Sequence, residues 1–374
     1  MKLINCLGIC SFNNSFILLV LLFLMCYCKK EPKAPIYNNE PAIEDTEKQQ
    51  RKLFVLNEGL FNMNNSSITL YNIDNKMVQA DVFEMQNGRK LGDTGNDMQI
   101  YGGKMYVVIN VSSQIEVINP KTSKSIKQIP VFNSNKPRQP RRITFHKNRA
   151  FVCCFDGTVA VIDTNSLEIT QYINVGRNPD GITVANNKLY VCNSGGLSSP
   201  NYDNTVSVID LNTLKEIKKI NVAINPYTIK ADNYGDVYVI SRGNYADVKM
   251  RLQIINSNTD ELKYTFTEFE ALNFTINGDT AYIYYYDFVS GGDSKIMTLN
   301  VKNEEILSYN FITDNTEIQT VYGIAIDKIT NDVYISDAKG FTSKGIVYCF
   351  DQYGKNTSSF KAGLNPSNMV FVNN

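Results

Sequence analysis

Short apolar runs recur along the chain at intervals of roughly 40 to 50 residues, the period of four-stranded propeller blades. Each run joins an aromatic residue to β-branched residues and ends in a small or polar turn, which predicts a strand. The runs are KLFVLNEG from Lys52, KMYVVINV from Lys104, RAFVCCFDG from Arg149, KLYVCNSGG from Lys188, DVYVISRGN from Asp236, TAYIYYYDF from Thr280 and DVYISDAKG from Asp332.

Three further strands accompany each run. The segment that follows it, such as GTVAVIDTNS or NTVSVIDLNT, alternates with period two, as a strand with one packed face does. Its Asp or Asn, followed by Asn-Thr or Asn-Ser, predicts the outer hairpin turn. A weaker strand comes next, as in LEITQYINV, and a fourth precedes the next run, as in PDGITVANN. Each unit therefore contains about four short strands.

The two ends of this region complement each other. The first unit begins directly at KLFVLNEG, without the strand that precedes the other runs, and the last residues, NPSNMVFVNN, have the pattern of that missing strand. A C-terminal strand that completes the first blade closes the ring and removes free sheet edges. We predict an all-β, seven-bladed β-propeller over residues 51–374, as one domain. Two β-sandwiches, the alternative, do not account for a sevenfold recurrence.

The N-terminal region has a different pattern. An apolar run of signal-peptide length, FILLVLLFLM at 16–25, ends at two cysteines and is followed at once by polar sequence. This arrangement resembles a bacterial lipoprotein signal, in which the cysteine thiol is lipidated. It predicts a signal peptide at 1–28, lipidation of Cys28 with Cys26 as second choice, a flexible polar tether at 29–50, and an outer-membrane anchor facing the cell surface. An ordinary secretory signal or an uncleaved anchor stays open.

Composition narrows the classes of function. Lys and Arg number 37, as do Asp and Glu, and this balance argues against a nucleic-acid binder. His146 is the only histidine, so a His-rich metal site is excluded, and no Ser or Cys partner for nucleophilic catalysis is recognisable. Cys153, Cys154, Cys192 and Cys349 lie in apolar runs without CxxC spacing, which favours core packing. We therefore predict no enzyme, no catalytic residue, no cofactor and no metal.

The repeated unit resembles the YVTN-type, or YncE-like, propeller family. Tyr190-Val191-Cys192-Asn193 is followed by VSVID, with Cys192 where that motif has Thr. The resemblance implies a ring of the WD40-like superfold, although the absence of Trp excludes the Trp-Asp dipeptide itself. With the lipoprotein signal and tether, the chain is also similar to the surface cobalamin-binding propellers of Gram-negative gut anaerobes, the BtuG type. That resemblance implies capture of a corrinoid and a TonB-dependent outer-membrane transporter as partner.

Two sets of loops should meet at one end of the central channel, the usual site in propellers: those after each run and those leading into each innermost strand. Tight turns alone require many of the Asn and Asp residues there, but not the bulky aromatics. Amides and aromatics together suit a large, partly polar, planar ligand. The candidate ligand-binding residues are Asn57, Asp97, Asn110, Phe155, Asp180, Asn193, Tyr202, Tyr227, Arg242, Tyr245, Tyr286, Phe288 and Tyr322.

The leading hypothesis is a surface-exposed, lipid-anchored protein that captures a small molecule, such as cobalamin or another corrinoid, for a TonB-dependent transporter. One alternative is a propeller that binds a protein or glycan and has no transport role. Another is a metal-dependent, lactonase-like hydrolase with oxygen ligands from Asp93, Asp97, Asp156 and Asp180. The basic patch PRQPRR at 137–142 could meet an acidic ligand or a partner loop, or form a solvated turn.

Overall fold

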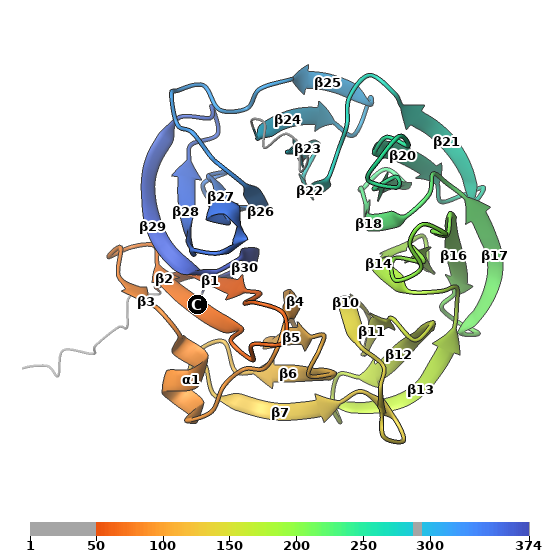
Figure 1. Ribbon diagram of the computed structural model, residues 1–374, viewed down its shortest axis with the longest axis horizontal. Coiled ribbons are helices and arrows are strands. Elements are labelled where there is room, and N and C mark those ends of the chain that lie inside the picture. Colours follow the sequence, from red (N-terminus) through yellow and green to blue (C-terminus); the bar gives the residue numbers. More distant parts are fainter. Residues whose placement is uncertain (1–49, 287–293, 374) are drawn as a thin grey trace, which may run out of the picture. The chain divides into compact units, whose positions relative to one another are not determined.

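The computed structural model describes residues 50–286 and 294–373, which form a closed ring of seven four-stranded antiparallel sheets (Figure 1). The predicted all-β, seven-bladed propeller is confirmed. Two candidate residues, Cys28 and Phe288, lie outside the described residues. No helix in the described part of the chain is long and apolar enough to cross a membrane.

Each blade takes four strands, and the first combines the two ends of the ring. The blades are: first, β30 (Pro366–Asn373), β1 (Arg51–Asn57), β2 (Ser67–Asn72) and β3 (Val78–Gln79); second, β4 (Gly95–Tyr101), β5 (Lys104–Ile109), β6 (Gln114–Ile118) and β7 (Ser125–Pro130); third, β10 (Pro140–His146), β11 (Arg149–Cys154), β12 (Thr158–Asp163) and β13 (Glu168–Asn174); fourth, β14 (Pro179–Ala185), β15 (Lys188–Asn193), β16 (Thr205–Asp210) and β17 (Lys215–Asn221).

The remaining blades follow the same order from channel to rim. They are: fifth, β18 (Pro226–Ala231), β19 (Asp236–Ser241), β20 (Arg251–Asn256) and β21 (Glu261–Phe266); sixth, β22 (Asn273–Asn277), β23 (Thr280–Tyr285), β24 (Lys295–Asn300) and β25 (Glu305–Ser308); seventh, β26 (Val321–Ile326), β27 (Val333–Asp337), β28 (Lys344–Phe350) and β29 (Asn356–Leu364). Outside the blades lie α1 (Val82–Asn87), the 3₁₀ turn η1 (Lys339–Phe341) and the hairpin of β8 (Phe132–Asn133) and β9 (Lys136–Pro137).

The ring closes as the sequence predicts. β30 pairs antiparallel with β1, with Arg51 opposite Asn373 and Asn57 opposite Pro366. β30 is thereby the innermost strand of the first blade and lies between β26 and β4 (Figure 1). Because β30 pairs with the inner edge of β1, that edge is not left open at the junction of the chain ends.

The repeated aromatic residue packs between neighbouring blades. Tyr190 and Tyr238 are fully buried and occupy the same position in the fourth and fifth blades. The hydroxyl of Tyr190 donates to Asp260 Oδ1 at 2.6 Å, and that of Tyr238 donates to the carbonyl oxygen of Val301 at 3.1 Å, each in the next blade. A buried tyrosine needs such a partner for its hydroxyl. Phe54, Tyr106 and Phe151 are fully buried at the equivalent position, so the run recurs because each of these blades buries an aromatic ring there.

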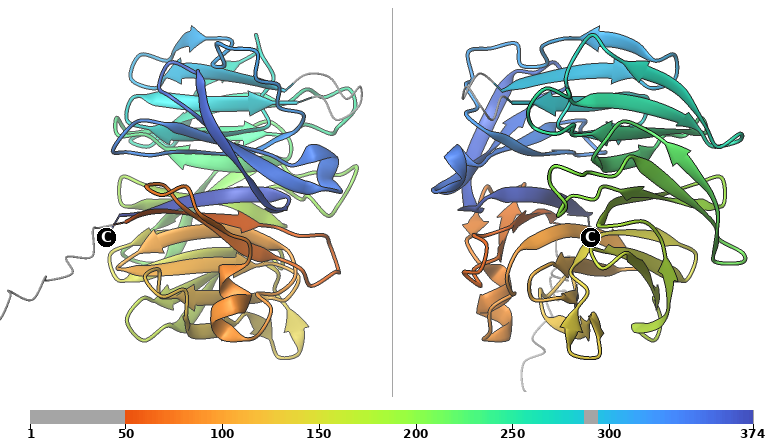
Figure 2. Two further views of the ribbon diagram at one scale, coloured as in Figure 1. Left: turned by 90° about the vertical axis from the view of Figure 1, so that its left-hand side faces the viewer. Right: turned by 45° about the vertical axis from the view of Figure 1, so that its right-hand side comes forward.

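Six of the seven innermost strands, all but β22, begin with a β-bulge, which positions the site. In β10, for example, the register against β11 shifts by one residue between Pro140 and Ile143, and comparable shifts occur at the start of β4, β14, β18, β26 and β30. A bulge re-aims side chains and is often found beside functional sites. All of these strands enter the channel from one face of the ring, the face that carries η1 in the side view (Figure 2).

Candidate functional site

Polar and aromatic side chains surround the channel at the face where the innermost strands begin. Each innermost strand contributes the residue at or next to its first position, and we call this set the mouth. Its seven members are Asn96, Arg141, Asp180, Tyr227, Asn273, Tyr322 and Ser367. Four of them follow a proline, which fixes the backbone where the chain turns into the channel.

The residues before these prolines hold the mouth in shape. Asn178, Asn225 and Asn365 have positive φ values of 44°, 61° and 55°, a conformation that asparagine tolerates better than most residues. Each amide donates to a carbonyl oxygen in a neighbouring loop, for example Asn178 Nδ2 to Phe155 at 3.0 Å and Asn365 Nδ2 to Gly59 at 2.8 Å. Asn178 thereby joins loops of the third and fourth blades, whereas Asn225 and Asn365 join two loops within one blade, so these loops are held in place before any ligand binds.

Three arginines lie over aromatic rings at the mouth. The guanidinium carbon of Arg242 is 3.2 Å from the ring centre of Tyr227, and that of Arg142 is 5.0 Å from the same ring. Arg141 lies 4.4 Å from the ring centre of Phe155. Cation–π stacking of this kind is strongest where water is excluded. Stacking on the rings therefore holds the three guanidinium groups in place at the mouth.

One carboxylate faces these arginines. Asp180 Oδ2 accepts from Arg141 Nη2 at 3.0 Å and from Nε at 3.2 Å, and Arg141 Nη1 donates to Asn96 at 2.6 Å. Arg142 Nε lies 3.6 Å from Asp180 Oδ1, which is within ion-pair range but too long for a hydrogen bond. The Nε atoms of Arg142 and Arg242 are buried and have no hydrogen-bond partner in the described structure. The mouth thus holds two buried N–H donors that lack an acceptor.

Burial makes a second carboxyl group at the mouth, that of Glu58, easier to protonate. Glu58 follows β1 and accepts a hydrogen bond from the hydroxyl of Tyr322. Burial raises the pKa of Glu58 above its ordinary value, although Tyr322 and the three arginines act in the opposite direction. Burial alone would raise the pKa of Tyr227, but the charges of Arg242 and Arg142 lower it overall. Positive charge therefore dominates the mouth.

Substitution Glu58→Gln is expected to flatten the pH dependence of stability. A carboxyl whose folded pKa is raised contributes stability that is present below its ordinary pKa of 4.5 and lost as pH rises through the folded value. Glutamine keeps an acceptor for Tyr322 without this titration, so the variant should gain stability relative to wild type as pH rises. Urea unfolding over a pH series measures this. Exposed Glu168→Gln is the control, and parallel curves for wild type and Glu58→Gln would contradict the prediction.

Aromatic side chains extend the mouth outward in two groups. Tyr202 and Tyr245, from loops of the fourth and fifth blades, meet edge to face with ring centres 6.2 Å apart, and Tyr245 is 48% exposed. On the other side, Phe341 of η1 lies 5.3 Å from Tyr322 and 6.2 Å from Tyr286 between ring centres. The mouth is thus bordered by flat apolar surfaces, which can contact a large ligand at low entropic cost.

Three of the predicted site residues use their amides within the blades. Asn57 and Asn193 are fully buried and form the same contacts in two blades: each amide donates to a neighbouring strand and each oxygen accepts from a glycine N–H. Asn110, also buried, donates to the carbonyl oxygen of Pro140 at 3.1 Å. The structure therefore brings Phe155, Asp180, Tyr202, Tyr227, Arg242, Tyr245, Tyr286 and Tyr322 around the mouth, and it places these three asparagines in the supporting layer.

Substitution Asn193→Ala is expected to lower the free energy of unfolding by about 2–4 kcal/mol, because it leaves several buried groups without partners. The amide donates to Thr205 and Ser207, at 2.9 Å each, and accepts from Gly176 N–H at 2.9 Å. Denaturant unfolding measures the change, with Asn165→Ala on an exposed outer turn as the matched control. Equal stability of the two variants would refute a supporting role for Asn193.

The four aspartates considered for a metal are engaged separately. Asp97 accepts from the N–H of Met98 at 2.9 Å, from that of Ile143 at 3.0 Å and from Asn368 Nδ2 at 2.8 Å, so it ties three blades together. Asp156 pairs with Arg138, and Asp180 pairs with Arg141. Asp93 accepts from backbone N–H groups of the loop after β1. Among the described residues, no group of three or more His, Cys, Asp or Glu side chains is arranged to hold a metal ion.

Several residues in or beside the mouth were not among the candidate ligand-binding residues. Arg141 is a member of the mouth, and Arg142, Glu58, Tyr284 and Phe341 lie beside it; only the two arginines belong to the basic patch at 137–142. Tyr284 donates to the carbonyl oxygen of Tyr322 at 2.7 Å. A signal for Arg141 exists in the sequence. It follows Gln139-Pro140, as Asp180 follows Asn178-Pro179, and an alignment of the repeats on this proline marks the position at the mouth in the four blades that have it.

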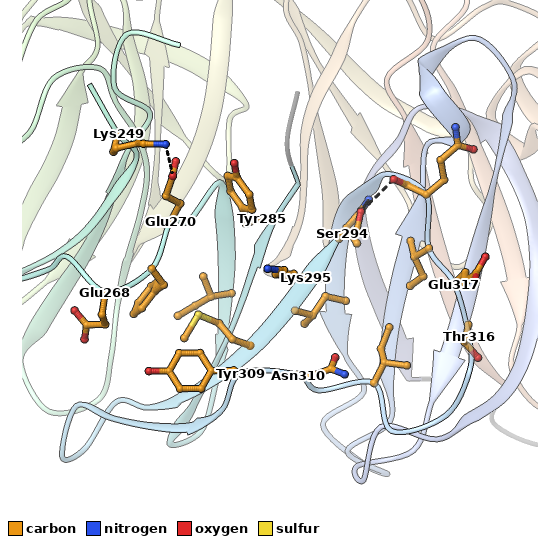
Figure 3. Close-up of a pocket in the computed structure, with 18 of the residues that line it drawn as sticks. Lys249, Glu268, Glu270, Tyr285, Ser294, Lys295, Tyr309, Asn310, Thr316 and Glu317 are labelled. Carbon is orange, nitrogen blue, oxygen red and sulfur yellow. Dashed lines mark hydrogen bonds and ion pairs between the residues drawn. The ribbon is translucent and has the colours of Figure 1, made fainter. Parts of the chain in front are cut away.

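A second hollow, of about 1330 Å³, lies at the side of the sixth blade (Figure 3). β25 pairs only with Thr298–Asn300, so the segments 267–270 and 309–319 border the other half of β24. Lys249 and Glu270 form an ion pair of 2.9 Å across part of its wall. Its basic and acidic side chains are equal in number, and none of the predicted site residues lines it. The mouth, with its excess of positive charge, is therefore the candidate site.

Comparisons with known proteins support the fold. A family described as a domain of unknown function, DUF5074, matches residues 52–371. No curated protein matches the sequence. Among solved structures, the chain is similar to hydrazine synthase of Kuenenia stuttgartiensis, with 14% identity, a TM-score of 0.59, and coverage of 73% of this chain and 93% of that one.

It is also similar to the computationally designed Ika8 protein, with 13% identity, a TM-score of 0.55, and coverage of 84% of this chain and 90% of that one. At such identities the likeness is one of fold alone. The family match, in contrast, spans nearly the whole ring. The chain therefore belongs to the DUF5074 family.

Proposed function

We propose that this protein is a binding propeller that captures a small molecule at the mouth, and that the ligand is a corrinoid such as cobalamin. The observation that carries the proposal is the stack of Arg142 and Arg242 on Tyr227, with two buried Nε–H donors that have no acceptor. A buried donor without a partner is unfavourable, so a ligand that supplies oxygens gains more than it would at a solvated surface.

The chemistry of a corrinoid matches this surface in two respects. Its macrocycle is broad and flat, which suits the aromatic border formed by Tyr202 and Tyr245 on one side and Phe341 on the other. Its peripheral amides carry carbonyl oxygens, and cobalamin adds a phosphodiester, both of which are acceptors for arginine. Because the loops are tied by Asn178 and its equivalents, little ordering entropy is lost on binding.

The proposal extends to the cellular setting. The apolar run that ends at Cys28 and the polar tether at 29–50 support a lipid anchor that holds the propeller at the surface of the outer membrane. In that position the protein would take corrinoid from outside the cell and transfer it to a TonB-dependent barrel. The support for this partner is the resemblance to surface cobalamin-binding propellers.

The test is calorimetric titration of residues 29–374, which contain the whole ring, with cyanocobalamin and cobinamide. We expect one-to-one binding of both, with cobinamide weaker because it lacks the phosphodiester that the arginines can bind. The bound protein should also retain the red colour through gel filtration. Absence of heat and of retained colour at high micromolar ligand would exclude corrinoid capture.

A further inference from the structure

The central channel contains an open cavity of about 530 Å³, which reaches from Asn273 and Ser367 of the mouth along the innermost strands. All seven innermost strands contribute to its wall. The charged side chains along it are Asp97 of β4, Arg142 of β10, Lys230 of β18 and Lys328, which follows β26. Positive groups therefore outnumber negative ones by three to one in the cavity wall.

The single carboxylate does not balance these cations. Both oxygens of Asp97 already accept hydrogen bonds, from Met98, Gln99, Ile143 and Asn368. Lys230 lines the cavity, is half-buried, and forms no ion pair and no side-chain hydrogen bond with any described residue. A partly desolvated ammonium group is stabilised by an opposite charge or an acceptor. The cavity thus has a cation that can bind an anion.

Two hydroxyls in the same wall also lack partners. Thr228, two residues before Lys230 on β18, is 3% exposed, and its Oγ1 makes no hydrogen bond to the described protein. The buried Oγ of Ser367 on β30 also makes none. With Arg142 Nε, the unused donors come from β10, β18 and β30, on different sides of the channel. Donors on several sides suit a tetrahedral anion better than a planar carboxylate, whose oxygens lie in one plane.

We propose that the channel below the mouth is an oxyanion site, of the phosphate or sulfate class, in which Lys230 and Thr228 bind the anion and Arg142 closes its upper end. The anion is either a free ion or the anionic arm of a ligand seated at the mouth. In the first case the site does not depend on the proposed function; in the second it defines which part of that ligand enters the channel.

Lys230 supplies an independent readout. Burial lowers the pKa of this lysine; Asp97 raises it and Arg142 lowers it further. An anion beside the ammonium group favours the charged form, so binding should be accompanied by proton uptake at alkaline pH. Calorimetry in two buffers of different ionisation enthalpy measures that uptake. The substitution Lys230→Met should abolish this proton uptake. If Lys230 had only a structural role, the substitution would leave the proton uptake unchanged.

The experiment titrates inorganic phosphate, sulfate and, as a control anion, chloride into residues 29–374. We expect phosphate and sulfate to bind, chloride not to compete, and Lys230→Met to weaken phosphate binding about tenfold or more, because it removes a charge-assisted contact. Thr228→Val, which keeps the shape of the side chain, should weaken it several-fold. The matched control is Lys218→Met on the exposed outer strand β17, and thermal unfolding verifies that each variant is folded.

Three ligands separate the outcomes. If Lys230→Met weakens inorganic phosphate, the site takes a free ion. If it weakens cyanocobalamin but not cobinamide, the oxyanion is the phosphodiester arm of a ligand at the mouth. If it changes the affinity for none of the three, the proposal is overturned. Arg242→Met alters the mouth alone, so loss of corrinoid binding with retained phosphate binding would distinguish failure of the two proposals.

Discussion

A chain that ends at Asn365, and so lacks β30, is expected not to form a stable ring. β30 pairs with β1 along its whole length and also lies against β4 and β26. Its loss exposes the inner edge of β1, in which Leu53 to Leu56 are fully buried. We expect the truncation to remove most of the about 5–15 kcal/mol that stabilises a typical domain. Gel filtration and urea unfolding, followed by circular dichroism, should show aggregation and no cooperative transition.

A circular permutant is the sharpest control for this result. Arg51 lies opposite Asn373 across the β1–β30 pair, so a short glycine-containing turn can join residues 366–373 directly to residue 51 as a hairpin. The permutant has the same strands in the same places and should recover a cooperative transition close to that of the wild type. If the truncated chain unfolded cooperatively with the wild-type midpoint, or if the permutant failed to recover, ring closure by β30 would not be the source of stability.

The fold could be predicted from the sequence because the blades bury an aromatic ring at the same position. Tyr190 and Tyr238 occupy this position, and each also hydrogen-bonds the next blade. Closure of the ring by the C-terminal strand could also be predicted, because the strand that the first unit lacks is present at residues 366–373. α1 was not predicted, because its six residues are too few to show a helical period.

The candidate site could be predicted only in part, because turns and binding sites use the same residue types. Asn193 and Asp180 were both predicted to face the channel, yet Asn193 hydrogen-bonds the neighbouring strand, whereas Asp180 pairs with Arg141 and Arg142. Arg142 lies in the basic patch at 137–142 but was not among the candidate ligand-binding residues, for a geometric reason. The bulge at the start of β10 shifts the register by one residue, and a shift of one reverses the side to which each following side chain points. Such a shift leaves no trace in the period of the sequence.

Simultaneous substitution of Arg142 and Arg242 by methionine is expected to reduce the affinity for cyanocobalamin about 100-fold, or about tenfold for each arginine removed. Methionine preserves much of the apolar contact with the ring of Tyr227, so the shape of the mouth should be retained. Asp180 keeps its ion pair with Arg141, at 3.0 Å, and is not left as an unpaired buried charge. Two like charges leave a buried site, so stability should be unchanged or higher.

Calorimetry and absorbance together test the origin of this effect. Burial raises the pKa of Tyr227, and the charges of Arg242 and Arg142 lower it overall, so the double variant should ionise Tyr227 at higher pH than the wild type. Phenolate absorbance, with Tyr227→Phe as the reference, reports that change. Arg138→Met is the matched control, because Arg138 stacks on Tyr172 and pairs with Asp156 outside the mouth. Unchanged cyanocobalamin affinity in the double variant, or an equal loss in Arg138→Met, would show that the stacked arginines do not bind the ligand.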